Sequence, residues 1–243
     1  MAVFVIGDIH GACRALQQLI ERVQPQHGDT FIFLGDYVDG WSQSSEVIRY
    51  LIKLDESFIC FFIKGNHDAW CEQWMNTGIP DPLWLRQGGA STVQSYETSK
   101  PEEWAIHREF LNRLMDYYVD DENRLFIHAG FSSMHGPEKE HYETNYYWDR
   151  TLWEMALTMD KRIQKDSKLY PKRLLLFKEI FIGHTPTLGY DETLPMHACN
   201  VWNMDTGAAY YGKLSAMNID TREVWQSDEV YQLYPGETGR NKN

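Results

Sequence analysis

Three apolar segments of this chain end in closely similar polar motifs, and this repetition limits the folds that it can adopt. Each motif contains Gly-Asp or Gly-Asn: AVFVI precedes GDIHG (residues 2–11), TFIFL precedes GDYVDG (30–40), and FICFFI precedes KGNHD (58–68). Short apolar runs rich in β-branched and aromatic residues predict buried strands. Loops at the ends of parallel strands are where α/β proteins place functional side chains. The repetition therefore predicts Asp, His and Asn side chains gathered at one edge of a sheet.

The segments between these strands predict helices, which makes the fold class α/β. Residues 12–23 repeat leucine, isoleucine and valine at the spacing of one helix face. Serines at 42–45 lead into EVIRYLIKL, which predicts a second helix with a serine cap. A repeated strand–loop–helix order implies a core of parallel strands joined by right-handed crossovers.

The second half of the chain is less regular but supplies two further strand ends. Residues 76–123 contain Gly-Gly and Pro signals and predict a mostly helical insertion beside the site. RLFIHAGF (124–131) and EIFIGHTP (179–186) then predict strands that deliver His128 and His184. The alternating segment 201–226 predicts an antiparallel meander. We expect one domain over residues 1–234 and a disordered tail over 235–243.

Composition excludes several classes of protein. A hydrophobic fraction of 43% with 14% aromatic residues argues against a disordered chain. A formal net charge of −12 argues against a protein that coats nucleic acid or an anionic membrane, so we expect neither partner. We also expect a monomer. The four cysteines show no Cys-x-x-Cys spacing, and the first apolar segment is too short for a signal peptide or a membrane span. A reduced, cytoplasmic protein is the expectation.

The polar residues at the strand ends predict a metal centre. They comprise Asp8, His10, Asp36, Asn66, His67, His128 and His184. Oxygen and imidazole ligands without thiolate suit Mn²⁺, Fe or Zn²⁺. Since one metal takes about three or four protein ligands, the surplus indicates two metals about 3.5–4 Å apart that share a carboxylate. Taken singly, an Asp after a strand is usually a turn residue and a His a core residue, but the ordered set favours metal binding.

Taken together, the motifs resemble those of a known family. GDIHG, GDYVDG, KGNHD, HAG and GHTP, followed by NMDTGAAYYGKL, resemble the metallophosphoesterase superfamily over about residues 3–220. The resemblance is closest to its phosphoprotein phosphatase branch, which contains bacteriophage lambda phosphatase and bacterial symmetrical diadenosine tetraphosphatases. It implies a β-sandwich of mixed sheets flanked by helices, in αββα layers. It also implies phosphoester hydrolysis by a metal-bound hydroxide, without a phosphoenzyme.

The resemblance implies a role for individual residues. Asp8 and His10 would bind a first divalent ion, Asp36 would bridge both, and Asn66, His128 and His184 would complete the second. His67 would be the general acid, with its tautomer fixed by Asp39. We expect Mn²⁺ in both positions, with Fe or Zn²⁺ as alternatives.

The chain departs from the family pattern at Gly40, where the branch usually carries an arginine that clamps the substrate phosphate. Arg150 resembles the second phosphate-binding arginine of the branch, and Asn66 is also expected to contact the phosphate. Arg86 is a weaker candidate for replacing the arginine missing at Gly40. For Trp41, a structural role is favoured over stacking on a substrate ring.

Three functions fit these motifs. The main expectation is a phosphatase that acts on phosphoserine or phosphothreonine, and also phosphotyrosine, in proteins. The alternative is a symmetrical diadenosine tetraphosphate hydrolase. The expected partner is therefore a phosphorylated protein in the first case and a small phosphorylated substrate in the second. A non-catalytic scaffold is disfavoured because no expected metal ligand is missing.

Overall fold

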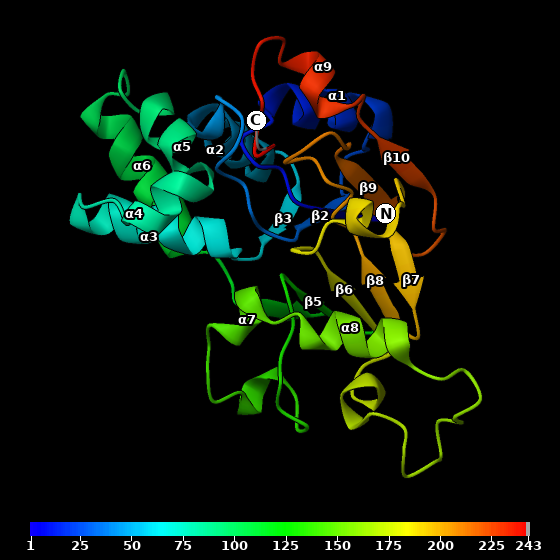
Figure 1. The fold of residues 1–243 in the computed structure, drawn as a ribbon. Coiled ribbons are helices and arrows are strands. Elements are labelled where there is room, and N and C mark those ends of the chain that lie inside the picture. The colour runs from blue at the N-terminus through cyan, green and yellow to red at the C-terminus, as the bar shows by residue number, and fades with distance from the viewer. Residues whose placement is uncertain (242–243) are drawn as a thin grey trace.

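Two five-stranded sheets stack face to face at the centre of the molecule (Figure 1). The structure is a computed structural model that describes residues 1–241. The first sheet has the order β10-β9-β1-β2-β3 and consists of β1 (Val3–Ile6), β2 (Thr30–Phe33), β3 (Ile59–Phe62), β9 (Ser215–Asn218) and β10 (Val224–Gln226). The second has the order β4-β5-β6-β8-β7 and consists of β4 (Tyr117–Val119), β5 (Arg124–Ile127), β6 (Glu179–Ile182), β7 (Met196–Ala198) and β8 (Val201–Asn203).

Both sheets are mixed, as predicted. Strands β1, β2 and β3 are parallel, with Val3 opposite Thr30 and Thr30 opposite Ile59. Strands β5, β6 and β8 are parallel in the other sheet. Because parallel neighbours end on the same side, the loops after β1, β2 and β3 share one edge, and so do the loops after β5 and β6. The sheets are completed by antiparallel pairs. Strand β9 pairs with β1 and with β10 in the first sheet, and in the second β4 pairs with β5 and β7 with β8.

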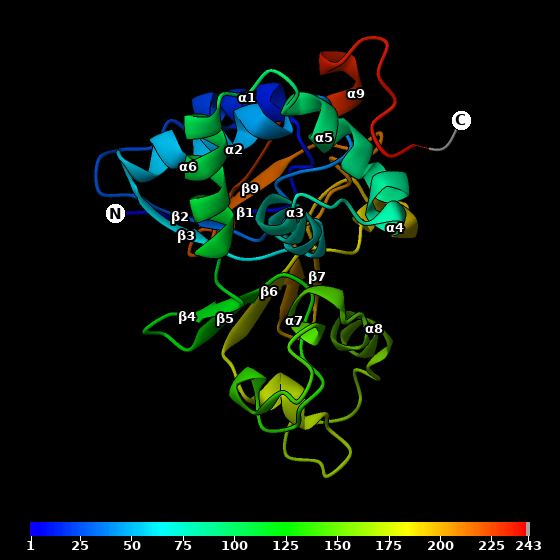
Figure 2. The same cartoon turned by 90° about the vertical axis from the view of Figure 1, so that its left-hand side faces the viewer.

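Helices cover the outer faces, which completes the predicted αββα layers (Figure 2). The first sheet is covered by α1 (Cys13–Val23), α2 (Ser44–Asp55), α3 (Asn66–Thr77) and α6 (Pro101–Asn112), and the second by α7 (Asn145–Trp148) and α8 (Thr151–Thr158). The shorter helices are α4 (Pro82–Trp84), η1 (Leu85–Gly89), α5 (Ala90–Ser95), η2 (Pro137–Lys139), η3 (Lys172–Leu175), η4 (Thr187–Tyr190) and α9 (Val230–Leu233). No helix within residues 1–241 is long and apolar enough to cross a membrane.

The layer between the sheets is apolar. Val5 and Ile32 of the first sheet pack in one buried cluster with Phe126 and Phe181 of the second. The rings of Phe126 and Phe181 stack with their centroids 4.9 Å apart. Burial of such side chains is worth about 1.5–3 kcal/mol each, so this layer fixes the two sheets, and the loops at their ends, relative to each other.

The segment predicted to be a meander is divided between the two sheets. Strand β8 joins the second sheet parallel to β6, whereas β9 and β10 form an antiparallel pair in the first. The expectation of one meander over residues 201–226 is therefore wrong. Alternation along a strand shows which side chains face inward, but it does not show which sheet the strand joins.

Part of the tail predicted to be disordered is packed against the domain. Gly239 lies against Trp41, and the backbone N–H of Arg240 donates to the carbonyl of Ala209 at 2.9 Å. The tail therefore contacts the domain at Gly239 and Arg240, on an aromatic surface that its own polar composition does not indicate. Residues 242–243 of the predicted tail lie outside the described residues.

Candidate metal centre

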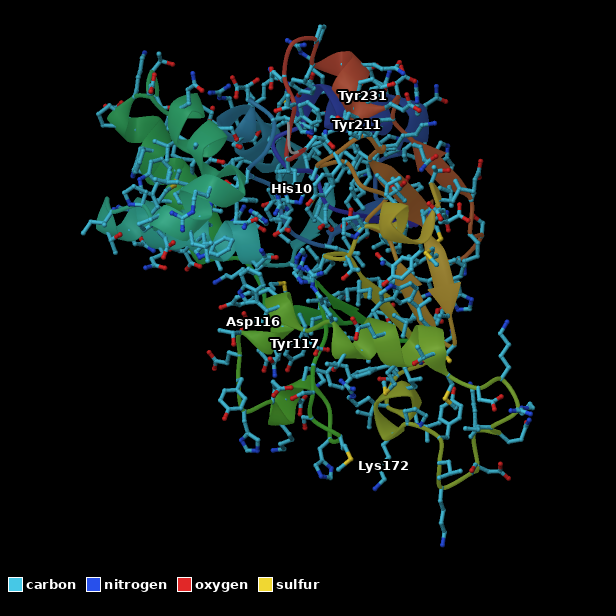
Figure 3. The ribbon with its side chains drawn as sticks, in the orientation of Figure 1. His10, Asp116, Tyr117, Lys172, Tyr211 and Tyr231 are labelled. Carbon is cyan, nitrogen blue, oxygen red and sulfur yellow. The ribbon has the colours of Figure 1, made fainter. Side chains whose placement is uncertain are left out.

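The predicted ligands come together between the ends of the two sheets. Asp8 and His10 follow β1, Asp36 follows β2, Asn66 and His67 begin α3 after β3, His128 follows β5, and His184 follows β6. All seven side chains are buried. Figure 3 labels His10 in the upper part of the molecule, among the elements of the first sheet. The strand order thus brings together residues that are up to 176 positions apart in the sequence.

Asp36 holds the central position. Its Oδ2 lies 3.5 Å from Nε2 of His10 and 3.5 Å from Nε2 of His128. Two groups of ligand atoms within 4.8 Å of one another share this carboxylate: one adds His10 and His67, and the other adds His128 and His184. A carboxylate between two sets of donors has the geometry of a ligand that bridges two ions.

The second group of donors is tightly converged. Oδ1 of Asn66 lies 2.9 Å from Nδ1 of His184 and 3.3 Å from Nε2 of His128. Nδ1 of His128 lies 2.7 Å from the carbonyl of Leu34 and donates to it, which leaves Nε2 as the free ligand atom. Oxygen and nitrogen atoms that can serve as ligands converge here, an arrangement that suits a cation when these imidazole nitrogens are deprotonated.

Burial sets the protonation of the centre. It raises the pKa of Asp8 well above its ordinary value, and the nearby Asp205 carboxylate adds to the rise. It lowers the pKa of His10 and His184 well below the ordinary value, so both imidazoles are neutral, as metal ligands must be. Burial also lowers the pKa of His128, but the adjacent Asp36 carboxylate outweighs this effect and raises that pKa to about 10.

This donor set fits two divalent cations. Buried carboxylates placed together are unfavourable without compensating positive charge, and oxygen with imidazole is the donor mixture of Mn²⁺, Fe and Zn²⁺ sites. Bound there, two such ions would activate a water molecule and stabilise the charge that develops on a phosphate. The identity of the metal stays a prediction.

The backbone at the site is strained. Four site residues other than glycine have a positive φ: His10 (53°), Asp36 (51°), Asp39 (74°) and His184 (69°). Such conformations cost about 1–3 kcal/mol each and persist where surrounding contacts hold them. The carbonyl of Asp36 accepts from the N–H groups of Ile9 and His10, which ties the first two loops together. Strain concentrated at these residues is typical of a functional site.

The carboxylate of Asp68 joins the loop after β2 to the loop after β3, a role that its sequence motif did not reveal. Its carboxylate accepts from the N–H groups of Asp36 at 2.7 Å, Tyr37 at 2.8 Å and Gly65 at 2.9 Å. It is fully buried. Asp68 therefore fixes the backbone that carries the candidate bridging ligand Asp36, and only the position of KGNHD beside GDYVDG in space makes this possible.

His67 and Asp39 form the predicted pair. Nδ1 of His67 lies 2.5 Å from Oδ2 of Asp39. The same carboxylate accepts from Nε1 of Trp84 and from Oγ1 of Thr92, both at 2.6 Å. Trp84 and Thr92, which hold Asp39 in place, come from the helical segment and were missed in the sequence. With Nδ1 engaged, Nε2 of His67 is the ring atom left for a substrate.

Asp205 is a further site residue that sequence reasoning did not single out. It follows β8, is buried, and lines the same cavity as His10 and Asp36. Burial raises its pKa to about 6. The available signal was its place in NMDTGA directly after an apolar strand, the same construction that identified the other ligands.

A cavity of about 330 Å³ opens above these ligands. Arg150 lines it together with Trp70, Trp148, Tyr210 and Arg240, and its expected role in phosphate binding stays a prediction. Arg86 lies instead on a neighbouring cavity, which Gly40 and Arg240 also line. Trp41 is fully buried and donates from Nε1 to the carbonyl of Ala208 at 2.7 Å, which is the structural role favoured from the sequence.

Gly183 is predicted to be essential for the position of Asp8. A Cβ at Gly183 would lie 2.1 Å from Oδ1 of Asp8, whereas a Cβ at Gly189, in the same loop region, would meet nothing within 4 Å. We expect Gly183→Ala to weaken Mn²⁺ binding by about tenfold or more, as for other substitutions that misplace a ligand, and Gly189→Ala to leave it unchanged. Calorimetric titration with Mn²⁺ measures both, and equal affinities would contradict the prediction.

Comparison with known proteins identifies the family. The sequence model described as Calcineurin-like phosphoesterase matches residues 1–212. The chain belongs to this family. The phosphoesterase identity expected from the motifs is thereby confirmed, and the two mixed sheets flanked by helices are consistent with its fold.

Several named proteins align along most of this chain. A symmetrical bis(5'-nucleosyl)-tetraphosphatase of Neisseria meningitidis is 24% identical, covering 93% of this chain and 95% of the relative. An asymmetrical bis(5'-nucleosyl)-tetraphosphatase of Oceanobacillus iheyensis is also 24% identical, with coverage of 92% and 90%. A protein serine/threonine phosphatase structure from Saccharomyces cerevisiae aligns with a TM-score of 0.61 at 14% identity, covering 94% of this chain and 80% of its own.

Proposed function

We propose that this phosphoesterase hydrolyses the polyphosphate chain of a bis(5'-nucleosyl) tetraphosphate. The curated relatives named above act on such dinucleotides by name, whereas the serine/threonine phosphatase is similar in fold alone at 14% identity. The motifs had favoured a protein phosphatase over a diadenosine tetraphosphate hydrolase, and the named relatives favour the reverse order.

The observation that carries the proposal is an aromatic wall beside the metal centre. The ring of Trp148 lies 5.0 Å from that of Trp70 and 5.9 Å from that of His184, measured between centroids. Trp148 is 42% exposed although it lines the cavity. An exposed indole next to a phosphate-cleaving centre is a surface on which a nucleobase stacks, a contact worth about 1–3 kcal/mol.

The side chains of the chain then have distinct tasks. Arg150, exposed at the cavity wall, is placed to bind phosphate oxygens by charge-assisted hydrogen bonds. Asn66 also lines the cavity and offers its amide to the same group. His67, oriented by Asp39, is placed to give a proton to the oxygen that leaves.

The test is turnover of diadenosine tetraphosphate by the purified protein with Mn²⁺, with a phosphoserine peptide as the competing substrate. Two ADP molecules identify symmetrical cleavage, and ATP with AMP identify asymmetrical cleavage. Both results support the proposal. Turnover of the phosphopeptide without turnover of the dinucleotide would contradict it.

A matched pair of variants tests the aromatic wall. We expect Trp148→Leu to raise KM for diadenosine tetraphosphate about tenfold or more through loss of stacking. Tyr142→Leu removes an aromatic ring that is 71% exposed and lies outside the cavity, and is expected to leave KM unchanged. An unchanged KM in Trp148→Leu would remove the stacking argument.

A further inference from the structure

The C-terminal segment brings a second arginine into the cavity above the metal centre. Arg240 lines the same cavity as His10, Asp36 and Arg150. Its side chain fills the space beside Gly40, since a Cβ at Gly40 would lie 3.2 Å from Cγ of Arg240. The absence of a side chain at Gly40 therefore leaves room for an arginine from a distant part of the chain.

The segment that carries Arg240 is firmly docked. The carboxylate of Glu237 accepts from the N–H of Ser42 at 3.0 Å and from its hydroxyl at 2.8 Å. The ring of Tyr234 stacks on that of Trp41, with centroids 5.2 Å apart. Figure 2 shows this segment running back from α9 towards α4. The anchoring residues Trp41 and Ser42 directly follow GDYVDG, so the tail is attached to the loop that supplies the bridging ligand.

The guanidinium of Arg240 has donors to spare. Within residues 1–241, its one side-chain hydrogen bond to another side chain is to the neutral amide of Gln87, at the long distance of 3.5 Å. Its Cζ lies 5.7 Å from the centre of the Tyr210 ring, a contact that holds the group without consuming its donors. The charge and most of its N–H groups stay available to a ligand in the cavity.

We propose that Arg240 is a phosphate-binding residue of the substrate, acting from the tail in the place left open by Gly40. Arg150 supplies a second guanidinium to the same cavity, so a chain of phosphates has two points of attachment. Guanidinium groups suit this task because their planar donors bind two phosphate oxygens at once. The inference rests on the proposed function only in that the substrate carries phosphate.

Binding of inorganic phosphate to the Mn²⁺-loaded protein, followed by calorimetry, tests this assignment without turnover. We expect Arg240→Gln to weaken binding about ten- to a hundredfold, the range for losing a hydrogen bond to a charged group. Arg240→Lys keeps the charge but not the bidentate geometry, so its affinity should fall in between. Arg162→Gln is the matched control, because Arg162 is exposed and lines neither this cavity nor the neighbouring one, and it should bind phosphate like the wild type.

The outcomes separate a binding role from a structural one. An unchanged unfolding temperature together with weaker phosphate binding in Arg240→Gln supports the assignment. Wild-type affinity in Arg240→Gln, or an equal loss in Arg162→Gln, overturns it. Failure to cleave diadenosine tetraphosphate would overturn the proposed function but leave this result intact, because the probe is phosphate itself.

Discussion

Asp36→Asn is expected to abolish both divalent metal binding and phosphoester hydrolysis. Oδ2 of Asp36 lies at equal distances from the ligand atoms of His10 and His128, so one substitution weakens both candidate metal positions. The amide keeps the shape of the side chain but removes the negative charge that attracts two cations. Calorimetry with Mn²⁺ should show no high-affinity binding, and activity should be lost with it.

Thermal unfolding provides a second measurement of this loss. A ligand that binds only the folded state stabilises it, by about 2.7 kcal/mol at a concentration a hundred times Kd. Mn²⁺ should therefore raise the unfolding temperature of the wild type but not of Asp36→Asn. Asp29→Asn is the matched control, since Asp29 is a buried carboxylate that accepts from the N–H groups of Ala2 and Gln26 away from the site. Two Mn²⁺ ions bound by Asp36→Asn with wild-type affinity would contradict the bridging role.

His67→Ala is expected to have the opposite combination of effects, with metal binding retained and the rate lowered about 10²–10⁴-fold. Nδ1 of His67 is engaged by Asp39, which in turn is held by Trp84 and Thr92. A ring oriented by a buried carboxylate is suited to proton transfer, and its loss should matter most where the leaving oxygen needs a proton.

Comparison of two esters isolates that proton. The loss in His67→Ala should be large for an alkyl phosphate and much smaller for p-nitrophenyl phosphate, whose leaving group departs without protonation. His197→Ala, an exposed histidine stacked on Trp202 away from the cavity, should leave both rates unchanged. Full activity of His67→Ala on the alkyl ester would remove the assignment of a general acid, and loss of Mn²⁺ binding would make His67 a ligand.

The location of the metal centre was predictable because its signals are local. Each candidate ligand follows an apolar run directly, so hydrophobic pattern and motif lie within ten or so residues of one another. Parallel strands then bring such loops to one edge whatever the details of packing. For the same reason, the order of strands and helices predicted an α/β fold with parallel strands at its core, whereas the αββα layers were expected only from the resemblance to the metallophosphoesterases.

The residues that were missed reach the site from other parts of the fold. Trp84 and Thr92 hold Asp39 across 45 and 53 positions of sequence, and Arg240 enters beside Gly40 from the far end of the chain. No pattern near these residues distinguishes them from ordinary helix or tail residues. Their roles depend on where a distant backbone passes.

The sequence by itself therefore determined the α/β fold class, the motifs at the strand ends and the expectation of metal-dependent chemistry. All three depend on short-range patterns of apolar and polar residues. Only the tertiary structure decided how the tail packs, which arginine fills the space at Gly40, and that Trp148 stays exposed beside the ligands. These depend on contacts between segments far apart in the chain, formed when apolar surfaces such as Trp41 and Tyr234 are buried together.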